Sequence, residues 1–270
     1  MTPHELAPDL ERRFGALRRL YGDAAYARLR SARIAVVGLG GVGSWAAEAL
    51  ARSGVAELTL IDLDHVAESN INRQVQATSA TLGQAKARAL RERILDIHPG
   101  CVVHALEEFA DESNWPALLP ATLDVLVDAC DQVRAKAVMA AWALATHTPH
   151  VVAGAAGGKR RPQDVEVSDL ALVTHDPLLA ALRQRLRKFH GAARAGPIGV
   201  ACVFSREAVQ MPQAGAPGQG QGEGQSERQI EAGLNCHGYG SSVAVTATFG
   251  MVAANLALEF AVGRHELLAR

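Results

Sequence analysis

Cysteine and aromatic residues are scarce in this sequence of 270 residues, and its positive and negative charges nearly cancel. The four cysteines are far apart and form no C-x-x-C pair, which argues against a disulfide framework and against a zinc site built from thiolates. With 27 basic and 28 acidic side chains, a nucleic acid would have to bind a local basic patch. The N-terminus lacks the apolar run of a secretory signal, so we expect a cytoplasmic protein.

An apolar run at 34–37 has the length of a buried strand and leads into a cluster of glycines. Three of these glycines have G-x-G-x-x-G spacing: Gly38, Gly40 and Gly43. A helical pattern of small residues follows, so a phosphate could approach the backbone amides at the helix N-terminus. A second predicted strand, at 58–61, ends in Asp62, which is placed to accept hydrogen bonds from ribose hydroxyls. The pattern predicts a bound nucleotide.

Strand-like and helix-like patterns alternate along most of the chain from Arg33 onward. Such alternation predicts an α/β fold with a doubly wound, mostly parallel sheet that helices cover on both faces. We expect further helices at 83–97, 133–146 and 177–188, and strands at 101–106, 123–127, 150–153, 165–170 and 199–204. Asp176 is the expected N-cap of the third of these helices, with Pro177 at its first position.

The chain divides by pattern into an N-terminal helical segment (1–32), a Rossmann-like part (33–155) and a C-terminal extension of the same globular unit (156–270). Within the extension, 212–230 is rich in Gly and Gln and is predicted to be a mobile loop. The small and apolar residues of 241–262 predict a helix long enough to span a membrane. Polar residues within it favour a helix packed in the core or in a dimer interface.

Four charged residues are predicted to meet near the glycine turn. Asp62 and Asp131 follow strands, and Arg73 and Lys86 lie on connections that leave the same edge of the sheet. A triphosphate that is being split needs cations on its oxygens and Mg²⁺ held by a carboxylate, whereas a nicotinamide dinucleotide needs neither. Taken singly, the two cations could be solvated surface charges, and Asp131 could cap the helix that begins near Val133.

These motifs, in this order, resemble those of the adenylating superfamily of ubiquitin-activating enzymes and their bacterial relatives ThiF and MoeB. The motifs are GLGGVGS, LIDLD, SNxxRQ, GQxK and DAxD, within residues 33–134. The resemblance implies an ATP site made of Gly38, Gly40, Gly41, Gly43, Asp62, Asp64, Asn70, Arg73, Gln74 and Lys86. It also implies that Arg13, Arg73, Lys86 and Asp131 are catalytic, with Asp131 at Mg²⁺. Arg13, in Arg-Arg-Phe-Gly, matches an arginine that family members send into the neighbouring subunit's site, which implies a homodimer.

The second half of the sequence resembles the branch of tRNA threonylcarbamoyladenosine dehydratases, with segments such as QDVEVSDL, VFSRE and VTATFGMVA. This resemblance implies an ATP-dependent dehydration of a tRNA nucleoside through an acyl-adenylate, with tRNA as the partner. The alternative is an activator of a ubiquitin-like sulfur carrier, but the paired C-x-x-C motifs usual in such proteins are missing. An NAD-dependent oxidoreductase and a non-catalytic nucleotide-binding scaffold are further alternatives. Sulfur-transfer proteins are possible partners, and no membrane partner is expected.

A basic stripe in the second half is a candidate surface for tRNA. It comprises Lys159, Arg160, Arg161, Arg183, Arg185, Arg187, Lys188 and Arg194. Few aromatic residues accompany these cations, so we expect contacts to the RNA backbone and not base stacking; a solvated helix face is the alternative. Cys236 is either an inert small residue or a nucleophile, and the proposed dehydration does not need it. The sequence leaves open whether Na⁺ or K⁺ is also bound.

Overall fold

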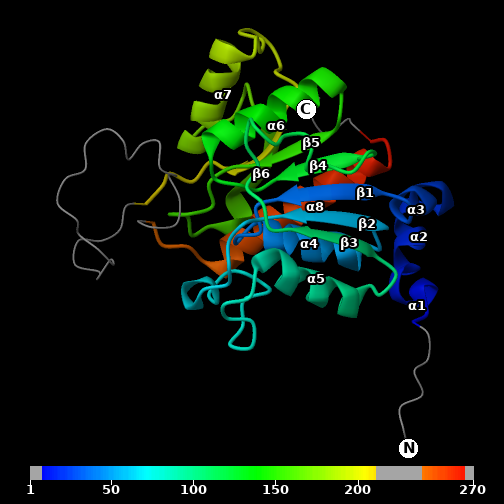
Figure 1. Cartoon of the computed structure of the whole chain (residues 1–270). Coiled ribbons are helices and arrows are strands. Elements are labelled where there is room, and N and C mark those ends of the chain that lie inside the picture. The colour runs from blue at the N-terminus through cyan, green and yellow to red at the C-terminus, as the bar shows by residue number, and fades with distance from the viewer. Residues whose placement is uncertain (1–7, 211–238, 265–270) are drawn as a thin grey trace, which may run out of the picture.

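A seven-stranded sheet forms the centre of the computed structural model, which describes residues 8–210 and 239–264 (Figure 1). The strand order is β3-β2-β1-β4-β5-β7-β6, and every neighbouring pair is parallel except β6 with β7. The expected doubly wound, mostly parallel α/β fold is therefore confirmed. The strands are β1 (Arg33–Val37), β2 (Glu57–Ile61), β3 (Val102–Leu106), β4 (Val125–Asp128), β5 (His150–Ala153), β6 (Val165–Asp169) and β7 (Ala201–Ser205).

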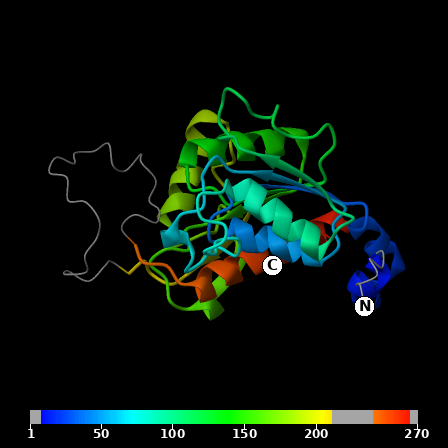
Figure 2. The ribbon, with the colours of Figure 1, turned by 60° about the horizontal axis from the view of Figure 1, so that its bottom comes forward.

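Helices cover both faces of the sheet, and the alternating side chains of β1 show which helix meets which face. Ile34 and Val36 belong to the core shared with α4 (Gly43–Arg52), α5 (Lys86–Ile97) and α8 (Val243–Ala261). Figure 2 shows these three helices along one face. Ala35 and Val37 pack on the other face, which α6 (Val133–Thr146) covers together with α7 (Pro177–Phe189).

The long apolar helix α8 packs on α4, β4 and β5. A Cβ atom at Gly250 would lie 2.5 Å from the Val42 carbonyl oxygen, so only glycine allows the two helices to approach this closely. By length and composition α8 could cross a membrane, yet 56% of its apolar window is buried inside the protein. More than half of this apolar window therefore packs inside the protein, as expected for a core helix.

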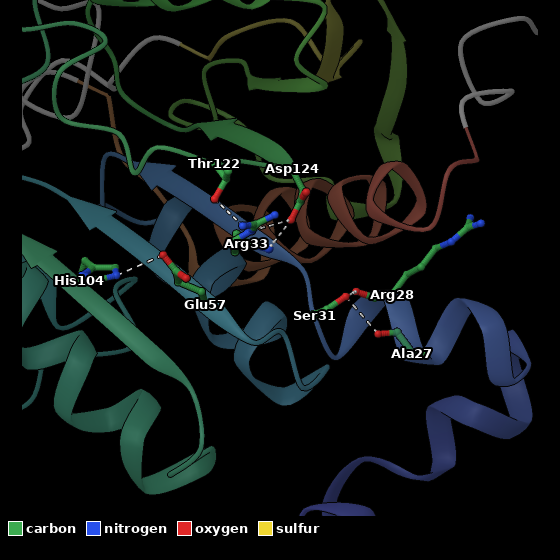
Figure 3. A network of polar contacts seen from close by, with 8 residues as sticks. All are labelled: Ala27, Arg28, Ser31, Arg33, Glu57, His104, Thr122 and Asp124. Atoms are coloured by element: carbon green, nitrogen blue, oxygen red, sulfur yellow. Dashed lines mark hydrogen bonds and ion pairs between the residues drawn. The ribbon is translucent and has the colours of Figure 1, made fainter.

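Polar contacts hold the amino ends of the strands, at the edge opposite the glycine turn. The Asp124 carboxylate accepts a hydrogen bond from the Arg33 backbone N–H at 2.8 Å, and the Arg33 guanidinium lies between Asp124 and Thr122 (Figure 3). On the next strands, His104 and Glu57 lie 3.2 Å apart. The contacts of Arg33 fix β1 against the segment that leads into β4, and the His104–Glu57 pair joins β3 to β2.

Several element boundaries differ from those expected from the sequence. The helix expected from Gly83 begins at Lys86, because Gly83 has a φ of +80° and Ala85 is extended and bridges to His65. The N-terminal segment forms three short helices, which Gly15 and Gly22 separate. They are α1 (Leu10–Phe14), α2 (Ala16–Tyr21) and α3 (Asp23–Leu29), and two 3₁₀ turns lie at Glu68–Asn70 and Pro162–Asp164.

Candidate active site

The glycine turn after β1 is shaped by close backbone contacts. Gly38 has a φ of +84°, and a Cβ atom there would come within 2.7 Å of the Cys130 backbone nitrogen. At Gly43, the first residue of α4, a Cβ atom would lie 1.8 Å from the Gly38 carbonyl oxygen. Gly40, by contrast, faces open space. Two glycines therefore close the turn, and the third leaves room for a ligand beside the N-terminus of α4.

A cavity of about 400 Å³ opens beside this turn, at the carboxyl ends of β1, β2, β4 and β5. The cavity is lined by all residues of the predicted ATP site except Gly43, which packs against Gly38 within the turn. The lining residues are Gly38, Gly40, Gly41, Asp62, Asp64, Asn70, Arg73, Gln74 and Lys86. Asp131 lines the same cavity. Its position matches the rule that ligands of open α/β sheets collect at the carboxyl edge of the strands.

Asp62 ties the glycine turn to the end of β2. Its carboxylate accepts hydrogen bonds from the backbone N–H groups of Leu39, at 2.6 Å, and Asp64, at 2.8 Å. Burial raises the pKa of Asp62, while the positive charge of Lys86 and the two backbone bonds oppose that rise. The predicted contact to a ribose would add to these bonds.

Lys86 brings a positive charge to the cavity from the first residue of α5. The side chain is buried, and its Nζ lies 2.6 Å from the largely exposed Asp64 carboxylate. The Lys86 backbone N–H also donates to the Asp64 carbonyl oxygen at 2.9 Å. Since Asp64 is open to solvent, the ammonium group can turn to an incoming phosphate at little cost in desolvation.

The segment after β2 positions Arg73 at the cavity. Its guanidinium donates to the Ser69 carbonyl oxygen at 2.7 Å and to the Asn72 side chain at 2.9 Å. The Trp45 indole donates to the Arg73 carbonyl oxygen at 2.9 Å, which ties this segment to α4. Asn70 accepts a bond from the Ala67 N–H at 3.0 Å. The segment's own hydrogen bonds therefore hold its polar side chains over the glycine turn.

Asp131 lies exposed at the cavity, just before α6. Gln132 is the N-cap of that helix and makes no side-chain capping bond, so Asp131 does not serve as the cap. Beneath it, the buried Asp128 carboxylate accepts hydrogen bonds from the Cys130 N–H at 3.1 Å and from Lys136 at 3.0 Å. Burial lowers the pKa of Lys136, but attraction to Asp128 outweighs this and leaves the pKa raised. A buried ion pair thus anchors the loop that carries Asp131.

Comparison with known proteins agrees with this geometry: the model of the ThiF family matches residues 14–269. This chain belongs to the ThiF family. It is 41% identical to the tRNA threonylcarbamoyladenosine dehydratase of Escherichia coli over 92% of each chain, and 38% identical to that of Haemophilus influenzae. A structure of the E. coli dehydratase in complex with ATP covers 94% of this chain at 39% identity, with a TM-score of 0.81. The E. coli molybdopterin-synthase adenylyltransferase is 36% identical over only 47% of this chain.

Two other residues that line the cavity were not singled out from the sequence. Phe109, on the loop after β3, is 39% exposed and lines the cavity, and so does Thr246 from α8. Phe109 could have been found, because a loop after a parallel strand lies at the same edge as Asp62 and Asp131. Thr246 could not, since it reaches the cavity only through the packing of α8 on α4, where its side chain lies against Gly41.

The predicted basic stripe is only partly available to a partner. For Lys159 the expectation is wrong: its ammonium is buried and donates to the carbonyl oxygens of Ser205, at 3.0 Å, and Glu207, at 2.7 Å. The Arg183 guanidinium donates hydrogen bonds to the carbonyl oxygens of Leu170 and Val173, in the segment between β6 and α7. The exposed members of the stripe include Arg160, Arg161 and Lys188. Cys236 and the 212–230 loop lie outside the described residues.

Arg13 lies away from the cavity of its own chain. Its guanidinium donates to the carbonyl oxygens of Ile97, at 2.6 Å, and Asp96, at 3.1 Å, at the C-terminal end of α5. Lys86 is at the other end of this 12-residue helix, roughly 16 Å from Ile97 by helical rise. A contact between Arg13 and a bound nucleotide would therefore have to be made in a second subunit.

Proposed function

We propose that this protein is an ATP-dependent dehydratase that cyclises the threonylcarbamoyl group of N6-threonylcarbamoyladenosine in tRNA. The observation that carries the proposal is the match to dehydratases of that name over 92% of the chain, second half included. A molybdopterin-synthase adenylyltransferase matches only 47% of this chain, so a match over nearly the whole chain favours the dehydratase function. The cavity supplies the phosphate site, cations and carboxylate that adenylation needs.

In the first step, an oxygen of the threonyl carboxylate forms a bond to the α-phosphorus of ATP. The bond from that phosphorus to the bridging oxygen breaks, and pyrophosphate leaves with the electron pair. Arg73 and Lys86 offset the charge that develops on the departing pyrophosphate, while the backbone around Gly40 holds the α-phosphate. The product is a mixed anhydride between the carboxyl group and AMP.

In the second step, the substrate's own carbamoyl group attacks the acyl carbon, and AMP leaves as a far better leaving group than hydroxide. The oxygen lost from the carboxylate departs with AMP, so the nucleoside loses one water overall. The two reacting groups belong to one molecule, and the protein's main task is to hold them near each other and exclude water. No side chain needs to become covalently attached, so this scheme does not need Cys236.

The residues at the cavity fit a magnesium ion. Asp131 presents an exposed carboxylate there, and Mg²⁺ commonly binds one or two carboxylates together with substrate phosphates and water. When bound, the ion would neutralise phosphate oxygens during adenylation. We propose ATP and Mg²⁺ as the cofactor pair. Na⁺ or K⁺ is a further candidate, tested by comparing turnover in sodium, potassium and tetramethylammonium salts.

The proposed assembly is a cytoplasmic homodimer that acts on tRNA. Arg13 would reach the site of the second subunit, in keeping with its distance from the cavity of its own chain. Activation of a sulfur-carrier protein is the second candidate function, because a molybdopterin-synthase adenylyltransferase is 36% identical over 47% of this chain. That relative matches less than half of this chain, and the sequence has no C-x-x-C pair. Sulfur-transfer proteins remain proposed partners only.

The test is to incubate the protein with ATP, Mg²⁺ and tRNA that carries threonylcarbamoyladenosine, and to measure AMP release and the mass of the nucleoside. We expect AMP release in step with loss of one water from the nucleoside. A parallel reaction replaces the tRNA with a ubiquitin-like carrier protein. The proposal would be overturned if AMP were released with the carrier protein alone and the threonylcarbamoyladenosine of the tRNA kept its mass.

A further inference from the structure

An exposed aromatic ring lies at the far end of α7. Phe189 is 59% exposed, although it continues the apolar spacing of Leu182 and Leu186, which are fully buried against α6. The pattern along the helix therefore predicts a core residue, but the packed layer ends one turn earlier. Figure 1 shows α7 at the margin of the molecule. A single exposed apolar side chain is common on protein surfaces, so the groups around the ring must indicate whether it has a role.

Two cations lie close to this ring. The Arg185 guanidinium carbon lies 5.1 Å from the ring centroid, and the Lys188 ammonium lies 4.9 Å from it. Both distances are typical of cation–π contacts. An aromatic ring beside two positive charges suits a chain of alternating bases and phosphates. A base can stack on the ring while the cations pair with the phosphates on either side.

Helix α7 connects the active-site cavity to the ring. Leu178, near the start of α7, lines the cavity, and Phe189 is roughly 16 Å further along the helix axis. The loop after β3 bridges the two places, since Phe109 lines the cavity and Glu112 lies 3.5 Å from the Arg185 guanidinium. An unpaired RNA strand with one nucleotide in the cavity would reach Phe189 within a few nucleotides.

We propose that Phe189, Arg185 and Lys188 form a stacking platform for an unpaired base of the RNA substrate, a few nucleotides from the base that is modified. This inference rests on the proposed function. It differs from the sequence-based expectation that the basic stripe contacts the RNA backbone without base stacking. The platform binds a single RNA strand through one base face and two phosphates. It therefore prefers flexible, unpaired strands and discriminates little between bases.

The test compares tRNA affinity of the full-length protein with that of Phe189→Ala and Phe189→Trp, by filter binding at several salt concentrations. Loss of one stacked base weakens binding by roughly 5-fold or more, and an indole ring restores it. Phe189→Ala leaves the slope of log affinity against log salt unchanged, whereas Arg185→Gln with Lys188→Gln lowers it by about 0.7 per cation. Leu20→Ala, at a side chain 73% exposed on α2, is the matched control and binds as the parent does.

Equal tRNA affinity of Phe189→Ala and the parent would overturn the platform, and so would a loss that tryptophan does not restore. A change in oligomeric state of Phe189→Ala, measured by sedimentation at unchanged RNA affinity, would instead assign the ring to a protein interface. Dehydration of tRNA by the parent protein is measured in the same preparations. If the parent modifies tRNA and the variant binds normally, only the platform fails; if the parent does not modify tRNA, the proposed function fails.

Discussion

Lys86 combines two properties that rarely occur together, a buried ammonium and an exposed counterion. Its partner Asp64 is solvated, so the pair stabilises the fold little, and the lysine remains available to a phosphate. We expect Lys86→Met to lower the rate of AMP formation by about 10²–10³-fold, the range for loss of one preorganised charge contact. The thermal midpoint should change little. Arg88→Ala, two residues on and largely exposed, is the control that keeps parental activity.

Lys136 presents the opposite case, because neither partner of its ion pair reaches solvent. Replacing it by methionine leaves the Asp128 carboxylate buried without a counterion, which costs about 3–5 kcal/mol of stability. The double variant Asp128→Asn with Lys136→Met should recover most of this loss, since it removes both charges and keeps an acceptor for the Cys130 N–H. Urea unfolding measures both values; a double variant no more stable than Lys136→Met would contradict this account.

At the scale of elements, the N-terminal helices are held to α5 through His98. The ring of Phe14 lies 4.6 Å from the imidazole, and the Arg30 guanidinium lies 2.9 Å from its Nε2. Burial, and then the charges of Arg30 and Arg13, lower the pKa of His98 from 6.5 to about 4. The unfolded chain therefore binds a proton in the window between pH 6.5 and 4 that the folded protein excludes.

Stability should accordingly be full above pH 6.5 and fall as the pH drops toward 4, by up to about 3 kcal/mol from this one group. His98→Gln cannot be protonated, and we expect a shallower fall across the same window. The measurement is urea unfolding of both proteins at half-unit steps of pH. Parallel curves for the parent and the variant would show that His98 does not set this dependence.

Elements with local signals could be predicted from the sequence. Asp176 accepts the capping bond from the Leu179 N–H, and Pro177 begins α7, as the sequence indicated. The glycine turn follows in the same way from backbone sterics. The burial of Lys159 could not be predicted, because its two acceptors are Ser205, at the end of β7, and Glu207 just after it, and only the packing of the sheet brings them to the lysine. The exposure of Phe189 could not be predicted either, since periodicity does not reveal where the covering layer ends.

At the scale of the whole molecule, the position of Arg13 decides how many chains make one active site. Within one chain it bonds the C-terminal carbonyls of α5, while the cavity lies near the other end of that helix. If Arg13 completes the site of a partner subunit, Arg13→Ala and Lys86→Met are each inactive but complement one another. A mixed dimer then contains one site with both the lysine of one chain and the arginine of the other.

We expect a refolded equimolar mixture of the two variants to recover up to about a quarter of parental activity, because half of the dimers are mixed and each has one complete site. AMP formation with tRNA measures the recovery, and sedimentation confirms the dimer. Arg12→Ala, at the exposed neighbouring arginine, should be active without mixing. If Arg13 only tethers α1 to α5, its removal lowers stability, and mixing restores nothing. That result would place the whole reaction within a single chain.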